Sequence, residues 1–290
     1  DSRKKKMKPL LVTVTGHRTN TLKHQLQHYK DNIRDAFIVV YEHENSDKKT
    51  KEEVESLAKE QGFKIHTVRT HRPFDWEEVT RIYNEIKDLY PNEWWIVADD
   101  DELQLYWEPI EDLIDDCEKH GWEYVSGGFV DRIGPDGTFP EIKPDSNLWE
   151  LFPIASFFRY PLSKACPNKT CLAKGRIKVS NGQHYIMEGQ NVVWGTKGWL
   201  HPKRYPINRN LVQVHHFKWD QTVFQRLLDV AQIKQDYAYS SEYQMMYDAI
   251  KDNNFKIDIN NPNFHTDVVP KPDYYSYRKW GYLKNLILHV

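Results

Sequence analysis

The sequence predicts an α/β domain built on a mainly parallel central sheet with helices on its faces. Three observations carry this prediction. Short apolar runs alternate with amphipathic helical patterns over the first third of the chain. Each of those runs ends in polar residues, which is typical of strands that meet at one edge of a parallel sheet. The chain has 290 residues, 13% of them aromatic, so it can fill one large interior although 28% of its residues are charged.

The expected elements follow in chain order from local patterns. Residues 10–15 (LLVTVT) are a β-branched run that ends at Gly16, which indicates a buried strand and a turn. A helical pattern follows, and then a second strand at 36–41 (AFIVVY). Another amphipathic helix is centred on 54–58, and residues 64–68 alternate as a third strand does.

The helix pattern at 76–90 has apolar side chains at i, i+3 and i+4. Residues 94–98 (WWIVA) form a fourth predicted strand that continues directly into acidic residues. Beyond them we expect a helix at 109–120, with proline near its start, and a strand at 122–130 broken by a Gly-Gly pair. Helical patterns return at 221–238 and 242–253.

The charge pattern limits the partners. A net charge of -2 gives no general attraction to nucleic acid. No apolar run approaches the roughly 20 residues that cross a bilayer, so we expect no transmembrane segment. Residues 1–8 (DSRKKKMK) are strongly basic and suit peripheral contact with anionic lipid, although a solvated tail is the simpler interpretation. Three cysteines make no disulfide framework, which favours reduced thiols and a cytoplasmic location.

Four consecutive acids follow the fourth strand, and they are the most informative feature. Asp99, Asp100, Asp101 and Glu102 repel one another, so local stability alone does not select them. A hard divalent cation resolves the repulsion because Mg²⁺ and Mn²⁺ prefer carboxylate oxygens. Strand alternation places Asp99 and Asp101 on one side and Asp100 on the other. The alternative is a solvated acidic loop.

Several segments together resemble a known family. Residues 94–103 (WWIVADDDEL) are similar to the D-x-D metal-binding segment of GT-A glycosyltransferases, particularly the family 2 type. Residues 214–219 (VHHFKW) resemble a late H-[YF]-[RK]-W segment of related enzymes. Residues 128–141 and 181–184 (NGQH) also look like bacterial sequences of this type, so that the resemblance covers roughly residues 9–225.

This resemblance implies a hexosyltransferase-like enzyme that uses Mn²⁺ or Mg²⁺. It would transfer a sugar from a nucleotide-sugar donor, a UDP- or GDP-sugar, to a glycan or another hydroxyl acceptor. With no flexible linker in the sequence, we expect one domain over 1–290. Its nucleotide-sugar half would be 9–105, its acceptor half 106–225, and its C-terminal helical extension 226–290.

The resemblance also implies roles for particular residues. Asp101 would bind the metal directly, Asp99 would lie nearer the ribose or the metal's water, and His216 would complete the metal sphere. Strand alternation points the neighbouring His215 away, whereas Lys218 shares the face of His216 and can neutralise diphosphate charge. Nucleotide contacts are expected from the strand ends, at Thr15, Gly16, Arg18, Glu42, Arg72, Asp99, Asp100 and Lys218.

One segment departs from the family pattern. After the second strand the family has D-[DG]-x-S-x-D, whereas residues 42–47 read EHENSD. The nucleoside-contacting carboxylate is therefore open between Glu42, Glu44 and Asp47.

The sequence leaves more than one candidate for the catalytic base and for the class of reaction. Inverting transfer needs a carboxylate base near the acceptor, for which Asp131 and Glu150 are the candidates, with His184 as a further acceptor-side residue. A metal-dependent nucleotidyltransferase is a rival, although such enzymes normally carry a Gly-rich loop after the first strand, and only Gly16 stands there. A non-catalytic carbohydrate-binding protein is the second rival.

Overall fold

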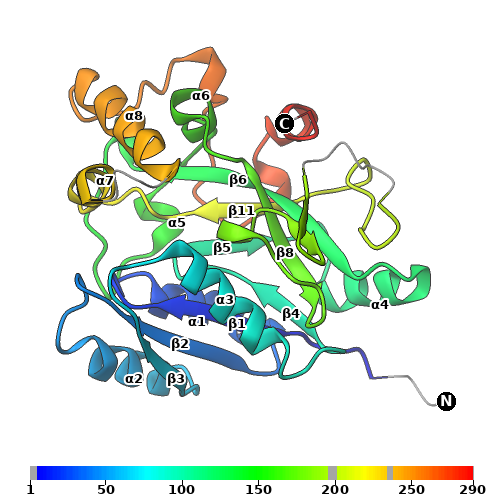
Figure 1. Cartoon of the computed structure of the whole chain (residues 1–290). Helices are drawn as coiled ribbons and strands as arrows, with labels where there is room; N and C mark the ends of the chain where they lie inside the picture. Colours follow the sequence, from blue (N-terminus) through cyan, green and yellow to red (C-terminus); the bar gives the residue numbers. More distant parts are fainter. Residues whose placement is uncertain (1–4, 195–200, 234–237, 290) are drawn as a thin grey trace.

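The computed structural model describes residues 5–194, 201–233 and 238–289 of the chain (Figure 1). The strands are β1 (Leu10–Thr15), β2 (Ala36–Glu42), β3 (Ile65–Thr70), β4 (Trp94–Val97), β5 (Glu102–Leu105), β6 (Tyr124–Ile133), β7 (Ile154–Ser156), β8 (Asn168–Lys174), β9 (Ile186–Glu188), β10 (Asn191–Val193), β11 (Val212–His216) and β12 (Asp267–Val268). The α-helices are α1 (Leu22–Tyr29), α2 (Thr50–Glu60), α3 (Trp76–Lys87), α4 (Ile110–His120), α5 (Leu148–Leu151), α6 (Arg159–Ser163), α7 (Val223–Ile233), α8 (Ala238–Asp252) and α9 (Trp280–Ile287). Single 3₁₀ turns are η1 (Lys30–Asn32), η2 (Pro135–Gly137), η3 (Asn181–Gln183), η4 (Pro262–Phe264) and η5 (Tyr274–Ser276).

Ten of the strands form one sheet, in the order β12-β7-β6-β8-β4-β1-β2-β3, with β11 and β5 joined to it through β6. Strands β1 to β4 pair in parallel with their neighbours in the order β4-β1-β2-β3. Strand β8 is antiparallel to both β4 and β6, so β6 runs in the same direction as β4. Strands β5, β7 and β8 run against the rest. The predicted α/β class with a mainly parallel central sheet is confirmed.

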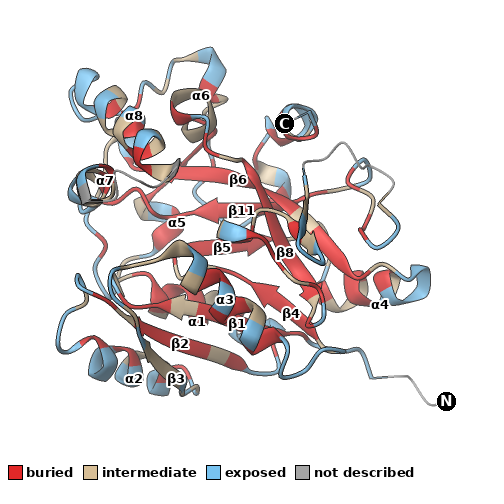
Figure 2. Cartoon of the chain, in the orientation of Figure 1, coloured by how far each residue is buried: buried red, intermediate tan, exposed pale blue. Residues whose placement is uncertain are grey.

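Helices cover both faces of the parallel part of the sheet. Apolar side chains of α1, α2 and α4 pack on one face, against residues such as Leu11, Ile38 and Ile96. Helix α3 packs on the other face, against Val12 and Val39. Alternate residues of each strand therefore feed two separate cores, which is why these strands read as continuous apolar runs. Figure 2 shows β1, β2 and β4 buried along most of their length, whereas the edge strand β3 is only partly buried.

The C-terminal part adds two further cores. Helices α7 and α8 lie together beside α6 and pack on Trp219 and Phe158 (Figure 1). Helix α9 packs through Trp280, Leu283 and Ile287 on the sheet near β6. No helix among residues 5–194, 201–233 and 238–289 is both long and apolar enough to cross a membrane. The first four residues of the basic N-terminal cluster lie outside the described part of the chain.

The turn between β4 and β5 connects two strands that do not pair with each other. Strand β4 pairs with β1 and β8, whereas β5 pairs with β11, which in turn pairs with β6. Within the sheet, β4 and β5 are separated by β8, β6 and β11, although along the chain only residues 98–101 connect them. This connection carries three of the four consecutive acids.

The expected break of the strand at the Gly-Gly pair is wrong, because β6 runs unbroken from Tyr124 to Ile133. The glycines are required for close packing instead. A Cβ on Gly127 would lie 2.5 Å from Cys171 Sγ, and one on Gly128 would lie 2.4 Å from Ile287 Cδ1. The pair lets the neighbouring β8 and α9 approach the strand.

Candidate functional site

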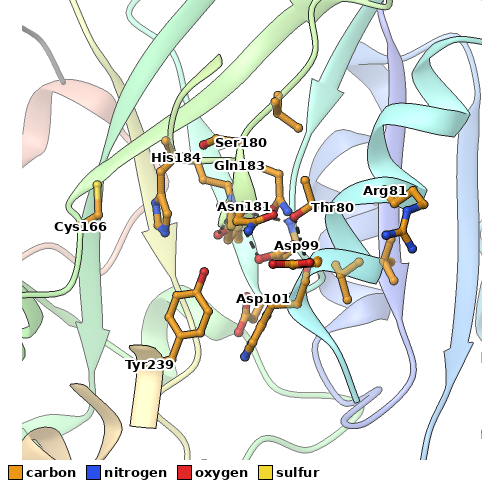
Figure 3. A pocket seen from close by; sticks show the side chains of 18 of the residues that line it. Thr80, Arg81, Asp99, Asp101, Cys166, Ser180, Asn181, Gln183, His184 and Tyr239 are labelled. Carbon is orange, nitrogen blue, oxygen red and sulfur yellow. Dashed lines mark hydrogen bonds and ion pairs between the residues drawn. The ribbon is translucent and has the colours of Figure 1, made fainter. Parts of the chain in front are cut away.

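A large pocket of about 970 Å³ opens beyond the carboxyl ends of β1 and β4. Its walls come from segments far apart in sequence, namely α3, β8, the 181–194 segment, the end of β11, α7 and α8. Figure 3 shows the acids in its floor, with Asn181, Gln183 and His184 on one side and Tyr239 of α8 on another. A ligand that fills it would contact both halves of the chain.

Three buried side chains in the floor can share one metal ion. The ligand atoms of Asp101, Glu102 and His216 all lie within 4.8 Å of one another. Strand pairing causes this, because His216 of β11 lies directly opposite Glu102 of β5. The Nε2 atom of His216 lies 3.5 Å from Asp101 Oδ1, while its buried Nδ1 has no hydrogen-bond partner within the described residues.

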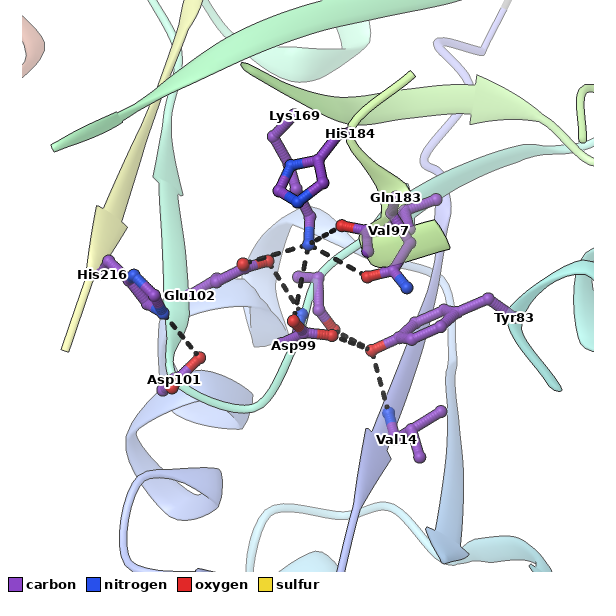
Figure 4. Close-up of polar contacts among 12 residues, drawn as sticks. Val14, Tyr83, Val97, Asp99, Asp101, Glu102, Lys169, Gln183, His184 and His216 are labelled. Atoms are coloured by element: carbon purple, nitrogen blue, oxygen red, sulfur yellow. Dashed lines mark hydrogen bonds and ion pairs between the residues drawn. The ribbon is translucent and has the colours of Figure 1, made fainter. Parts of the chain in front are cut away.

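The neighbouring Asp99 faces a different partner (Figure 4). Its carboxylate accepts a hydrogen bond from the Tyr83 hydroxyl at 2.7 Å and lies 3.5 Å from Lys169 Nζ. Lys169 comes from β8, is 1% exposed, and lies 3.1 Å from Glu102 Oε2. It also donates to Gln183 Oε1 at 3.0 Å. One ammonium therefore holds two of the four acids and η3 together.

The surroundings shift the pKa values of the acids and of Lys169 in different directions. Burial and the adjacent Asp101 raise the pKa of Asp100 to about 7, although Thr15 Oγ1 donates to it at 2.7 Å. Burial raises the pKa of Asp101 as well, but the nearby His216 and two arginines more than offset this and hold it below its usual value. Burial lowers the pKa of Lys169, and its two carboxylate partners more than compensate and raise it.

Besides Lys169, four cationic side chains face the same floor. Arg18 donates to Asp220 Oδ1 at 2.7 Å and lies 3.9 Å from Asp101, so most of its charge is compensated. Within the described residues, the hydrogen bond of Lys218 Nζ goes to the Tyr243 hydroxyl at 3.3 Å, and the ammonium lies over that ring. Arg226 of α7 has no ion-pair partner in the described part of the chain. The fourth, Arg159, lies 3.8 Å from a carboxylate of α8.

The two cations without a carboxylate partner in the described residues, Lys218 and Arg226, favour an anion. Burial and the neighbouring Arg159 and Arg226 cations lower the pKa of Lys218 well below its usual range. A phosphate group bound between Lys218 and Arg226 would relieve that repulsion.

The predicted nucleotide contacts do not all reach the pocket. Thr15, Gly16, Arg18, Asp99, Asp100 and Lys218 line it. Glu42 instead accepts a hydrogen bond from Thr70 at 3.3 Å, and Arg72 is exposed, so neither belongs to the lining. Of the alternatives to Glu42, Glu44 lines a small adjoining hollow of about 50 Å³ together with His17, Phe74 and Trp76.

The two predicted bases lie outside the pocket lining as well. Asp131 is buried, and its carboxylate accepts hydrogen bonds from the main chain of Phe158 and Arg159 and from Trp219 Nε1, at 3.1 to 3.3 Å. These bonds hold the start of α6 in place. Glu150 is exposed on α5. Their catalytic role stays a prediction.

Sequence reasoning missed several residues of the site. Glu102 was included in the acid run without a role, and Lys169, Arg159 and Arg226 were not predicted. Arg226 lies on a helix that the sequence predicts. Its side chain faces the acids because of the way α7 packs, which the local sequence does not show. Lys169 stands between Asn168 and Thr170 in a polar stretch, and this local pattern does not indicate that its side chain is buried.

Comparisons with known proteins give distant structural likeness. No protein-family model and no curated protein sequence matches the chain. A crystal structure of S. aureus TarS is similar over 83% of this chain and 42% of that one, with 12% identity and a TM-score of 0.33. A structure of S. aureus TarS residues 1–349 matches 58% of this chain and 47% of that one, with 16% identity and a TM-score of 0.30. The chain thus spans less than half of the length of both. The case for a function depends on the pocket.

Proposed function

We propose that the chain is a metal-dependent glycosyltransferase of the GT-A, family 2 type that uses a nucleotide diphosphate sugar. One observation carries the proposal. The carboxylate and imidazole cluster of Asp101, Glu102 and His216 shares one large pocket with Lys218 and Arg226, two cations that have no carboxylate partner in the described part of the chain. A divalent cation and a diphosphate are the pair of ligands that these opposite charges suit. The D-x-D and HHFKW segments that resemble the family supply all of these residues except Arg226, which comes from α7.

The residues of the cluster fit Mn²⁺ or Mg²⁺. Two carboxylates and one imidazole supply oxygen and nitrogen ligands, and His216 Nε2 lies 3.5 Å from Asp101 Oδ1. Asp101, Glu102 and His216 would hold the ion, with Asp99 near it across Lys169. Once bound, the ion would neutralise charge on the diphosphate leaving group.

The chain's own cations would assist departure of the nucleoside diphosphate. As the acceptor oxygen bonds to the anomeric carbon of the sugar and loses its proton, the bond between that carbon and the diphosphate oxygen breaks, and negative charge grows on the departing oxygen. Lys218 and Arg226 would stabilise it because both face the pocket and neither has a carboxylate partner in the described part of the chain. Arg18 would contribute less, since Asp220 already compensates it.

The nucleoside would lie toward the carboxyl ends of β1 and β2. There the hollow beside Glu44 is lined by the rings of His17, His43, Phe74 and Trp76. Phe74 lies edge-on to both His43 and Trp76, at 4.9 and 4.8 Å between ring centroids. Aromatic walls beside one carboxylate suit a base that stacks and donates hydrogen bonds.

Turnover of UDP- and GDP-sugars with and without Mn²⁺ tests the proposal. We expect metal-dependent release of nucleoside diphosphate, and Asp101→Ala should abolish both release and metal-dependent binding of the nucleoside diphosphate. Asp115→Ala, on the exposed face of α4, is the matched control and should behave as wild type. Release of inorganic pyrophosphate from a nucleoside triphosphate would indicate a nucleotidyltransferase instead. Full activity of a folded Asp101→Ala variant would also refute the proposal.

A further inference from the structure

The large pocket has a second half whose chemistry differs from that of its floor. This half is formed by η3, the β9–β10 hairpin and the residue that follows the hairpin. The side chains that it gives to the pocket are aromatic, apolar or amide-bearing, namely Asn181, Gln183, His184, Tyr185, Met187, Gln190, Val192 and Trp194. None of these carries a carboxylate or an ammonium. A diphosphate therefore has its place in the floor, and this second half is left for an uncharged molecule.

An exposed indole stands at the edge of this half. Trp194 lines the pocket although 73% of its surface is exposed, which makes it the most exposed of the large apolar side chains in the described residues. Its ring lies edge-on to Tyr185, with 5.8 Å between the centroids. Tyr185 is itself fixed, because its hydroxyl bonds to Cys166 Sγ and Asn168 Nδ2. An indole held this way offers a flat apolar face to a ligand.

Polar groups without hydrogen-bond partners among the described residues face the same space. Asn181 and Gln190 make no side-chain hydrogen bond within the described residues, and both are exposed at the pocket. Gln183 accepts from Lys169 through Oε1, which leaves its Nε2 amide as a donor. Planar amides can donate to and accept from adjacent hydroxyl groups.

His184 adds a fixed acceptor. Its Nδ1 donates to the carbonyl oxygen of Asn168 at 2.7 Å, and burial beside Lys169 lowers its pKa to about 3, so the ring is neutral and Nε2 carries a lone pair. Figure 3 shows this ring directed into the pocket. A Cβ at position 182 would lie 2.7 Å from Nε2, so the glycine there keeps this nitrogen open.

We propose that this half of the pocket binds a saccharide, and that the acceptor of the transferase is a sugar hydroxyl. An apolar face beside amides, an imidazole acceptor and no net charge matches a sugar ring, which presents C–H groups on its faces and hydroxyls around its edge. The inference rests on the proposed function and narrows its acceptor from any hydroxyl compound to a saccharide. The saccharide ring lies on Trp194, and its hydroxyls reach Gln190 and His184.

The test uses methyl glycosides of glucose, galactose, mannose and N-acetylglucosamine as probes. Saturation-transfer NMR on the intact protein measures their binding without a donor, and nucleoside diphosphate release from UDP- and GDP-sugars measures turnover. We expect at least one glycoside to bind and to accelerate release. Trp194→Ala should raise the glycoside concentration for half-maximal effect about tenfold or more, a larger factor than any change in the KM of the donor.

A control and a competing acceptor make the test decisive. Tyr282→Ala removes another exposed ring, 60% exposed on α9 and outside the pocket lining, and should bind glycosides as wild type does. If donor turnover occurs but no glycoside binds, or if a serine-containing peptide accelerates release and the glycosides do not, the saccharide assignment is wrong. Equal glycoside affinity in wild type and Trp194→Ala would also overturn it. Glycoside binding without any donor turnover would instead refute only the proposed function.

Discussion

Replacing Lys169 by methionine tests how the acid cluster is held. The substitution keeps the length of the side chain and removes its charge, which leaves Glu102 and Asp99 without their common cation. At an effective dielectric constant of about 20, an ammonium 3.1 Å from a carboxylate oxygen gains roughly 5 kcal/mol of gross attraction. The contribution of Asp99 is smaller, because it lies 3.5 Å away and its side chain is 37% exposed.

The net effect is smaller than the gross attraction, because both ions were removed from water on folding. Breaking a buried pair from one side typically costs about 3–5 kcal/mol, and we expect Lys169→Met to lower the free energy of unfolding by that amount. Urea denaturation followed by fluorescence measures it.

Lys87 provides a matched control for this experiment. It is also fully buried, but its Nζ donates only to the main-chain oxygen of Ile177, and no carboxylate pairs with it in the described residues. Lys87→Met removes a buried charge that makes no ion pair in the described residues, so the free energy of unfolding should change by about 1 kcal/mol or less, or rise. Equal losses in Lys169→Met and Lys87→Met would show that the carboxylate contacts of Lys169 do not hold the cluster.

Two further predictions use pH and metal titration. Burial lowers the pKa of Lys87 in the folded chain to about 7, against about 10.5 when the chain is unfolded. Between these pH values the unfolded state therefore binds more protons than the folded state. The free energy of unfolding of wild type should thus increase relative to that of Lys87→Met as pH rises from 7 to 10. Urea midpoints at several pH values check this, and a constant difference would contradict it. His216→Ala should raise the Mn²⁺ concentration needed for donor turnover about 10-fold or more. His215→Ala should instead destabilise the fold, because His215 is buried against Trp149 and hydrogen-bonds to Gln213. An unchanged Mn²⁺ requirement in His216→Ala would show that His216 serves only in packing.

The sequence predicts those parts of the fold that local pattern determines. Strands β1 to β4 and helix α3 are continuous or periodic apolar runs, and their predicted bounds differ from the structure by a few residues at most. The separation of His215 from His216 is also local, because it follows from alternation along the regular strand β11. His216 faces the pocket, and His215 faces Trp149 on the opposite side.

What the sequence could not predict depends on distant partners. The sequence does not predict that Glu102 begins strand β5, because β11 pairs with it from more than a hundred residues later. Its carboxylate tolerates burial because Lys169 of β8 reaches it. The Gly-Gly pair was read as a break because the local pattern does not contain Cys171 or Ile287, which occupy the space that side chains would need.

The connection at 98–101 has a consequence for how this chain can vary. Because β4 and β5 are fixed in separate pairings, the length of this connection sets which residue of β5 lies opposite His216. Inserting or deleting one residue there would slide β5 by one position, turn Glu102 to the other face and remove it from the metal cluster. Relatives of this chain should therefore exchange amino acids within 98–101 while keeping their number. Insertions would accumulate in loops that do not set a strand register, such as the polar segment between β2 and α2.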